Sequence, residues 1–180
     1  DCIIGNPPFV DSETMTKSAP EERAFIASHY SCAKGNWDLF IPFVQRGLTL
    51  SSHFGSVSLI SPNKWLAAPY GTELRNFTKT SLSTILDFSS GRAFPGVGVA
   101  AICSNFVKNF NESITIWRFE NINTKAEKFI VSRMHIETKE NWGFLLSQYI
   151  DILMEISSTD NWFGDYLTAS DPFTVSEAYD

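Results

Sequence analysis

The sequence predicts an α/β protein with a largely parallel sheet, and three observations indicate this fold. Two short apolar stretches, residues 2–4 and 55–61, have the pattern of strands, and each runs into proline soon afterwards. Each is followed by stretches with helical features, so two strand-to-helix units stand side by side as in a doubly wound sheet. Two further strand-like stretches, 83–88 and 97–107, are joined too tightly for a crossover helix, which predicts an antiparallel hairpin.

The first strand and the turn after it organise the chain. Cys2, Ile3 and Ile4 follow one another without alternation, which is typical of a strand buried on both faces. Pro7 and Pro8 have no N–H, and each restricts the backbone of the residue before it. Asn6-Pro7-Pro8-Phe9 is therefore predicted to be a stiff turn at a strand's carboxyl end, where open α/β sheets bind ligands.

The segments between the strands carry helix signals. The polar residues 11–19 predict a loop, either ordered over a site or disordered. Residues 20–32 begin with proline and two acids, which favours a helix start. Asn36 is expected to cap the next helix, unless Pro42 delays or kinks it, and residues 69–78 predict a further helix.

Composition and charge exclude several classes of protein. The chain has 14 Lys and Arg against 20 Asp and Glu, a formal charge of −6, which argues against a free-standing DNA binder but allows one part of a larger DNA enzyme. Its three cysteines and three histidines are scattered, so neither a disulfide framework nor a metal site is expected. No signal peptide and no apolar run of ~20 residues occur, so we expect a cytoplasmic protein that spans no membrane.

The predicted turn has the groups to hold a planar amine. The amide oxygen of Asn6 and the carbonyl of Pro7 are hydrogen-bond acceptors on a backbone with little freedom, and Phe9 offers a flat apolar face. Two fixed acceptors beside a stacking surface suit an NH2 group on an aromatic ring. The alternative is an ordinary turn that ends a strand and has no role in binding or catalysis.

The pattern Asp-x-x-x-x-Asn-Pro-Pro-Phe, residues 1–9, resembles the catalytic motif of adenine-specific (amino) DNA methyltransferases. Over residues 1–120 the order of elements looks most like the gamma-ordered enzymes of restriction-modification systems. The resemblance implies the C-terminal half of a Rossmann-like class I methyltransferase sheet with an antiparallel terminal hairpin, followed in residues 121–180 by a helical connector and the start of a target-recognition region. The family's glycine-rich cofactor loop precedes this turn and is missing here, so we expect an incomplete and inactive fragment.

The resemblance also implies roles for individual residues in methyl transfer from S-adenosylmethionine to a flipped adenine of double-stranded DNA. Asn6, Pro7, Pro8 and Phe9 would form the catalytic turn, Phe94 would stack as a second aromatic, Lys64 and Arg92 would touch phosphates, and Asp1 would lie near the cofactor. For Phe94 a place in the core of the hairpin is the alternative. For Lys64 and Arg92 the alternative is a place on the solvated surface, without a contact to phosphate.

Two other classes of function fit the same turn. Protein glutamine methyltransferases have a similar Asn-Pro-Pro-Tyr turn, because the glutamine amide is also a planar NH2 group, although this chain has Phe9 in place of tyrosine. A non-catalytic interaction fragment with an idle turn is the other alternative. The strand and glycine-rich loop expected before the turn in the family would separate an enzyme from an idle turn.

Overall fold

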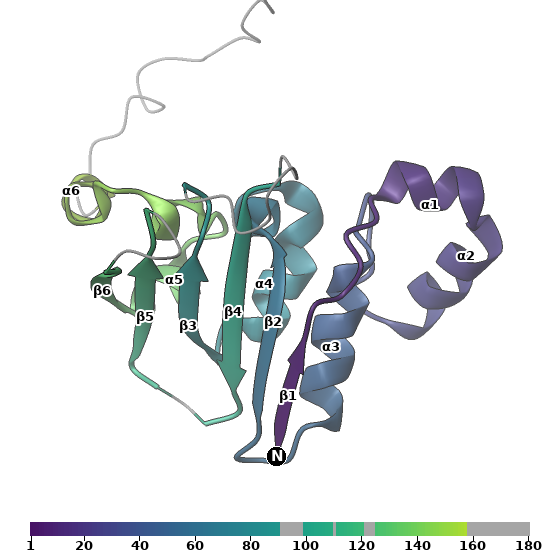
Figure 1. The fold of residues 1–180 in the computed structure, drawn as a ribbon, viewed down its shortest axis with the longest axis horizontal. Coiled ribbons are helices and arrows are strands. Elements are labelled where there is room, and N and C mark those ends of the chain that lie inside the picture. Colours follow the sequence, from purple (N-terminus) through teal and green to yellow (C-terminus); the bar gives the residue numbers. More distant parts are fainter. Residues whose placement is uncertain (91–98, 110, 121–124, 158–180) are drawn as a thin grey trace, which may run out of the picture. The chain divides into compact units, whose positions relative to one another are not determined.

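The computed structural model describes residues 1–90, 99–109, 111–120 and 125–157, and these contain a six-stranded sheet with the order β1-β2-β4-β3-β5-β6 (Figure 1). The strands are β1 (Cys2–Gly5), β2 (Ser56–Pro62), β3 (Leu82–Asp87), β4 (Ala101–Val107), β5 (Ser113–Arg118) and β6 (Glu127–Ser132). Parallel pairs are β1 with β2 and β3 with β5, whereas β4 is antiparallel to both β2 and β3, and β6 is antiparallel to β5. The mixed α/β sheet and the antiparallel β3–β4 pair confirm the predicted α/β class and the hairpin, but in the described residues only two of the five strand pairs are parallel, so the sheet is not largely parallel.

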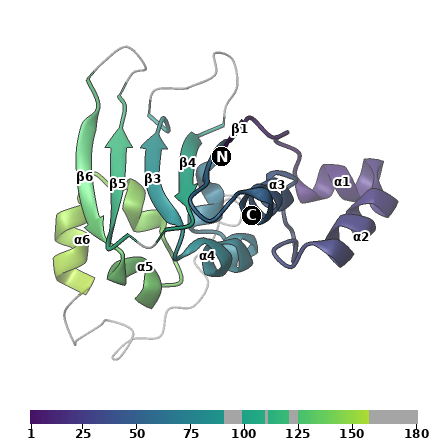
Figure 2. The ribbon, with the colours of Figure 1, turned by 90° about the horizontal axis from the view of Figure 1, so that it is seen from below.

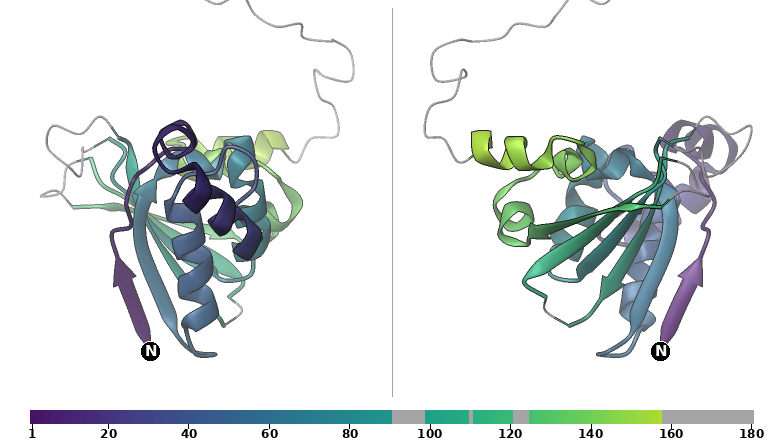
Figure 3. Two further views of the ribbon diagram at one scale, coloured as in Figure 1. Left: turned by 90° about the vertical axis from the view of Figure 1, so that its right-hand side faces the viewer. Right: turned by 60° about the vertical axis from the view of Figure 1, so that its left-hand side comes forward.

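Helices cover one face of the sheet. The α-helices of the first 147 residues are α1 (Ser12–Ser18), α2 (Pro20–His29), α3 (Phe40–Leu50), α4 (Thr72–Thr78) and α5 (Met134–Thr138), and the 3-10 turns are η1 (Asn63–Leu66), η2 (Pro69–Gly71) and η3 (Gly143–Leu146). Figures 2 and 3 show α3, α4 and α5 on the same side of the strands. Along β2 every second residue is buried, as expected of a strand with one covered face.

The prediction that β1 is buried on both faces is wrong for the described structure. Ile3 is half-buried, but the Ile4 side chain is 80% exposed. In the described part of the chain β1 lies at the end of the strand order, and the helices pack on only one face. The apolar run indicated the strand correctly, but not how much of it is covered.

Three helix predictions need correction. Residues 12–18 form α1 rather than a loop, because the Asp11 carboxylate caps the helix at the Thr14 N–H and the Met15 side chain is buried. Helix α2 already ends at His29. Helix α3 begins at Phe40, so Asn36 does not cap it, and Pro42 occupies the first turn, where no backbone N–H is needed.

The sheet continues beyond residue 120, where the charge pattern predicted a connector. Strand β6 pairs with β5, and the Arg118 guanidinium lies 3.9 Å from an Asp87 carboxylate oxygen and 4.7 Å from the Phe129 ring centre. Glu127 and Lys128 on this last strand are exposed, Glu127 lies 3.9 Å from the Arg118 guanidinium, and Lys128 Nζ lies 5.4 Å from the Trp117 ring centre; charged residues commonly protect edge strands. The charged residues of 127–132 thus belong to a strand and not to a connector.

The chain divides into two compact units, residues 1–147 and 148–180. The first unit contains the six-stranded sheet of the described residues. The described part of the second unit contains α6 (Ile150–Ser157), whose Ile152 and Ile156 side chains are exposed. The assignment of residues 1–120 to a catalytic half and of 121–180 to a connector and target-recognition region stays a prediction.

Candidate active site

The Asn-Pro-Pro-Phe turn lies at the carboxyl end of β1, beside the carboxyl end of its parallel neighbour β2. The Asn6 side chain is exposed, and nothing in the described part of the chain hydrogen-bonds to its amide. Pro7 is buried and Phe9 is half-buried, whereas Asn6 and Pro8 between and beside them are exposed. The turn therefore packs against the protein through Pro7 and Phe9. After the turn, the Val10 carbonyl accepts a hydrogen bond from the Leu39 N–H at 2.9 Å, which ties the segment to the start of α3.

A cavity of about 290 Å³ opens beside this turn. It is lined by Phe9, Asp11, Asp38, Pro62, Asn63, Lys64, Val99 and Ala100. The parallel β1–β2 pair explains why Phe9 and Lys64, far apart in sequence, share one cavity. Its volume is close to the lower end, ~300 Å³, of small-molecule pockets, which suits a single heterocycle better than a whole dinucleotide-sized ligand.

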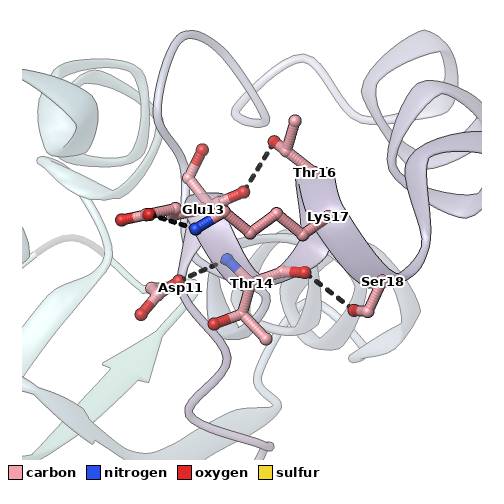
Figure 4. A network of polar contacts seen from close by, with 7 residues as sticks. Asp11, Glu13, Thr14, Thr16, Lys17 and Ser18 are labelled. Atoms are coloured by element: carbon pink, nitrogen blue, oxygen red, sulfur yellow. Dashed lines mark hydrogen bonds and ion pairs between the residues drawn. The ribbon is translucent and has the colours of Figure 1, made fainter.

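A second cavity of about 590 Å³ adjoins the first, because Asp11 and Asp38 line both. Its other lining residues come from α1, from the loop before α3 and from η2: Ser12, Glu13, Thr16, Lys17, Asn36 and Tyr70. Figure 4 shows the polar contacts of α1, in which Asp11 Oδ1 accepts from the Thr14 N–H at 2.7 Å and Lys17 bonds Glu13 at 2.6 Å. The Thr14 hydrogen bonds hold the pKa of Asp11 below its usual value, so this carboxylate stays ionised.

Asp38 is the half-buried acid between the two cavities. Burial raises the pKa of its carboxyl and the negative charge of Asp11 raises it further, whereas the Tyr70 hydroxyl, the Ser12 N–H and the charge of Lys64 lower it. The Tyr70 hydroxyl is itself buried and faces this carboxylate, although their geometry falls short of a full hydrogen bond. Burial, followed by the charge of Asp38, raises the pKa of Tyr70, so the phenol is neutral.

The loop that carries Asp38 is fixed by an arginine from α2. The Arg23 guanidinium lies 4.4 Å from the Trp37 ring centre and donates hydrogen bonds to the carbonyls of Trp37 and Gly35 at 3.2 and 2.8 Å. Gly35 has a φ of 63°, a left-handed conformation that glycine adopts at low cost. Arg23 thus holds the backbone of the loop directly before Asp38.

The other wall of the first cavity follows β2. The Asn63 N–H bonds the Ala100 carbonyl at 2.9 Å and its side-chain Nδ2 bonds Ser89 Oγ at 3.0 Å, so the start of η1 is held against β4 and the end of β3. The Lys64 side chain next to it is exposed at the cavity wall. A lysine in this place can reach an anionic group at the rim.

The structure brings only some of the predicted site residues together. Phe9 and Lys64 line one cavity, and Asn6 lies on the exposed side of the same turn. Asp1 is exposed at the start of β1, where its carbonyl accepts from the Ser56 N–H at 3.0 Å. Arg92 and Phe94 lie outside the described residues.

Sequence reasoning missed the acids at the cavity. Asp11 is one polar residue of the predicted loop 11–19, and Asp38 follows Asn36, the expected cap of the next helix. Neither residue carries a local motif that points to the turn, and Tyr70 lies still farther along the chain. Asn63 had a weak signal, since it is the first polar residue after a strand that ends at Pro62.

The described residues contain no group of three or more His, Cys, Asp or Glu side chains placed to hold a metal ion. Among the same residues, no helix has the length and apolar character needed to cross a membrane.

Solved structures with a similar fold are methyltransferases and restriction-modification enzymes. The type IIG restriction endonuclease BpuSI matches with a TM-score of 0.60 and 14% identity over 86% of this chain and 22% of its own. The restriction-modification enzyme MmeI, solved in complex with DNA, matches with a TM-score of 0.53 and 19% identity over 72% and 18%. A putative class I S-adenosylmethionine-dependent methyltransferase from Listeria monocytogenes matches with a TM-score of 0.54 and 8% identity over 68% and 38%. The fold is thus the Rossmann-like fold of class I methyltransferases.

The family follows from the sequence. The model of the Eco57I restriction-modification methylase family matches residues 1–94, which include the whole of the turn and β1 to β3, and the chain belongs to this family. The type II restriction enzyme and methyltransferase RM.Eco57I of Escherichia coli is 23% identical over 137 residues, 73% of this chain. The type II methyltransferase M.PaeR7I of Pseudomonas aeruginosa is 33% identical over 76 residues, 42% of this chain. The chain spans only 14% and 13% of the lengths of these two relatives.

Proposed function

We propose that this chain supplies the catalytic turn of a gamma-type DNA adenine-N6 methyltransferase that uses S-adenosylmethionine within a longer restriction-modification enzyme. The observation that carries the proposal is the Asn6-Pro7-Pro8-Phe9 turn at the carboxyl ends of β1 and β2, beside a cavity lined by Phe9. Membership of the Eco57I family supports DNA as the substrate, and so does the likeness to an enzyme solved with DNA. The glutamine methyltransferase alternative has no comparable support.

The turn provides what an adenine amine needs in order to react. The lone pair of that nitrogen is delocalised into the ring, so the amine is a poor nucleophile. Hydrogen bonds from its two N–H groups to the Asn6 amide oxygen and the Pro7 carbonyl favour a pyramidal nitrogen and concentrate the lone pair on it. Because the acceptors sit on a proline-stiffened turn, little reorganisation is needed as the amine becomes cationic.

Base flipping accounts for the aromatic residue at the cavity. An adenine inside a duplex is out of reach of the turn, so it must be extruded at a cost of a few kcal/mol. Stacking on Phe9 would recover part of that cost, and Lys64 at the same wall would meet a phosphate of the distorted strand. With a formal charge of −6, the chain would leave most contacts with the DNA backbone to other parts of the enzyme.

The described residues do not by themselves fit S-adenosylmethionine. Among them, no glycine-rich turn joins a strand to a helix, and Asp1 is exposed at the start of β1. The cofactor would supply an electrophilic methyl group, and the residues described here would hold and orient the acceptor. A cytoplasmic location, where DNA and the cofactor meet, goes with this proposal.

Asn6→Ala in the complete enzyme tests the proposal. It removes an acceptor used mainly in the transition state, so we expect kcat to fall roughly 100- to 1000-fold while Kd for duplex DNA changes little. Methylation is measured with labelled cofactor, and the modified base is identified by mass spectrometry of digested DNA. Asn76→Ala, at an exposed asparagine on α4, is the matched control and should leave the rate unchanged.

Two results would contradict the proposal. One is Asn6→Ala retaining most of the methylation rate, which would remove the turn from the mechanism. The other is a product that contains methylated cytosine or methylated protein glutamine in place of N6-methyladenine.

A further inference from the structure

A second asparagine lies at the cavity beside the turn, on the wall that follows β2. Asn63 and Phe9 line the same cavity of about 290 Å³. Asn63 is half-buried and comes directly after β2, whose carboxyl end lies beside that of β1. The wall of this cavity therefore includes an amide side chain that the proposed function has not yet used.

The backbone at Asn63 is held in place by neighbouring segments. Its N–H donates to the Ala100 carbonyl at 2.9 Å, directly before β4. The Trp65 side chain, two residues farther along η1, is 1% exposed, and the Trp65 carbonyl accepts a hydrogen bond from the Arg75 guanidinium of α4. The Asn63 side chain thus projects from a backbone that does not need to rearrange when a ligand enters the cavity.

The Asn63 side chain is oriented as well as placed. Its Nδ2 donates to Ser89 Oγ at 3.0 Å, and the Ser89 N–H donates to Asp87 Oδ1 at 2.9 Å. Asp87 is buried at the end of β3, where its Oδ2 lies 3.9 Å from Arg118 Nε. An asparagine Nδ2 carries two N–H groups, and the bond to Ser89 uses one of them. Within the described part of the chain the second N–H has no partner, so it remains for a ligand in the cavity.

An adenine in this cavity would need such a donor. Apart from its amine, the polar atoms of the adenine ring are acceptors, and the ring nitrogens N1 and N7 lie on either side of the amine. In the proposed function the N–H groups of the amine bond to Asn6 and Pro7. A neighbouring ring nitrogen that is buried without a partner would cost binding free energy, and a free N–H in the cavity wall removes that cost.

We propose that Asn63 is a substrate-binding residue, which donates its second Nδ2–H to the ring nitrogen beside the amine of the flipped adenine, N1 or N7. Ser89 holds the amide in the orientation that presents this donor to the cavity. The proposal rests on the proposed function and deepens it, because it adds a contact to the ring of the same base. Asn6 and Pro7 hold the amine, Phe9 covers the ring, and Asn63 satisfies its edge.

Base analogues in duplex DNA test the proposal in the complete enzyme. Wild type and Asn63→Ala are compared on adenine and on its 1-deaza, 7-deaza and 3-deaza analogues at the target position, each with one ring nitrogen replaced by C–H. We expect the 1-deaza or the 7-deaza analogue to lower kcat/KM of wild type roughly 3- to 10-fold, the usual effect of one neutral hydrogen bond. Asn63→Ala should lose a similar factor on adenine and little more on that same analogue, because the contact is already absent. The 3-deaza analogue, altered on the far side of the ring, should affect both enzymes by the same factor.

Two further variants separate a contact from a structural role. Asn63→Asp keeps the shape of the side chain and can accept from the Ser89 hydroxyl, but it has an acceptor in place of the free donor. It should therefore lose more on adenine than Asn63→Ala and recover part of that loss on the sensitive analogue. Asn76→Ala, at an exposed asparagine on α4, is the matched control and should respond to all analogues as wild type does.

The rates are expressed per folded molecule, with thermal melts of each variant. If Asn63→Ala is slowed by one common factor on adenine and on every analogue, Asn63 does not contact the ring, and the proposal is overturned. Wild-type methylation of adenine would then still stand, so the proposed function would survive. A wild-type enzyme that methylates some other acceptor would instead overturn the proposed function itself.

Discussion

At the scale of single residues, Phe9 decides between a working site and an ordinary turn. It is half-buried and lines a cavity, whereas Phe106 in β4 is fully buried against Trp65, with ring centres 6.5 Å apart. A core phenylalanine stabilises the fold through packing on all sides. A phenylalanine with one face on a cavity can instead offer that face to a ligand.

Phe9→Ala in the complete enzyme should lose methylation rather than stability. We expect the flipped base to lose ~1–3 kcal/mol of stacking, and the free energy of unfolding to fall by less than the roughly 3–5 kcal/mol typical of a buried phenylalanine. Phe9→Tyr should retain activity. Methylation rates and thermal melts of both variants measure this, with Phe106→Ala as the reference for a true core residue.

If Phe9→Ala melts as far below wild type as Phe106→Ala and methylates normally per folded molecule, Phe9 belongs to the core and not to the site.

At the scale of elements, a buried arginine holds the two 3-10 turns after β2. Arg75 on α4 is 4% exposed, and its Nη1 donates to the carbonyls of Trp65 and Ala68 at 2.5 and 2.9 Å. The backbone at Gly71 passes so close that a Cβ there would lie 2.0 Å from the Trp65 carbonyl oxygen and 2.7 Å from Arg75 Nη1. The absence of a side chain at Gly71 therefore allows η1 and η2 to close around the guanidinium.

Gly71→Ala should destabilise the protein by about 1–3 kcal/mol, the usual range for overpacking. The direction of the change in unfolding free energy is informative. Where the backbone tolerates a side chain, replacing glycine by alanine stabilises a protein by about 0.4–1 kcal/mol, because the unfolded chain has less conformational entropy. Urea denaturation measures the change. Gly143→Ala is the comparison and should cost less, because its new Cβ would lie 3.0 Å from Asn141 Oδ1, which accepts from the Gly143 N–H, and 3.2 Å from Ala67 Cβ, with no backbone atom as close as at Gly71.

A Gly71→Ala variant as stable as wild type would mean that η1 and η2 separate without loss, and that Arg75 does not hold them.

At the scale of the whole molecule, the proposed function would place the groups that hold the methyl acceptor on the described residues, which offer little to bind a cofactor. The cavity beside the turn has about the size for one heterocycle, and β1 and β2 are followed by prolines, short helices and 3-10 turns rather than by glycine-rich turns. A dinucleotide-sized ligand is normally held at the glycine-rich turn and helix N-terminus after a strand. The two halves of such a reaction can thus reside in different parts of a longer chain.

The chain by itself should not bind S-adenosylmethionine measurably. We expect no heat of binding in calorimetric titrations up to about 1 mM, which corresponds to a binding free energy weaker than roughly 4 kcal/mol. The complete enzyme, titrated in the same buffer, is the positive control. Micromolar binding to the chain alone would show that the cofactor site lies among these 180 residues.

The sequence alone predicted β1 to β4, the turn and the antiparallel pairing of β3 with β4, because each has a local cause. Prolines at residues 7, 8 and 62 remove backbone donors, and β-branched apolar runs precede them. The same local signals identified Asn6, Pro7 and Phe9 as candidates, and the resemblance they carry led to the family that the comparisons support.

Only the tertiary structure decided which residues surround the turn. Asp38 reaches the site because α1 and α2 fold back and Arg23 fixes the loop before α3, a contact between segments that no local pattern encodes. Whether residues 127–132 form a strand or a connector depended in the same way on pairing with β5 and on Arg118. Local backbone chemistry determines where strands and turns occur, whereas the partners of a half-buried charge depend on distant segments that meet only in the fold.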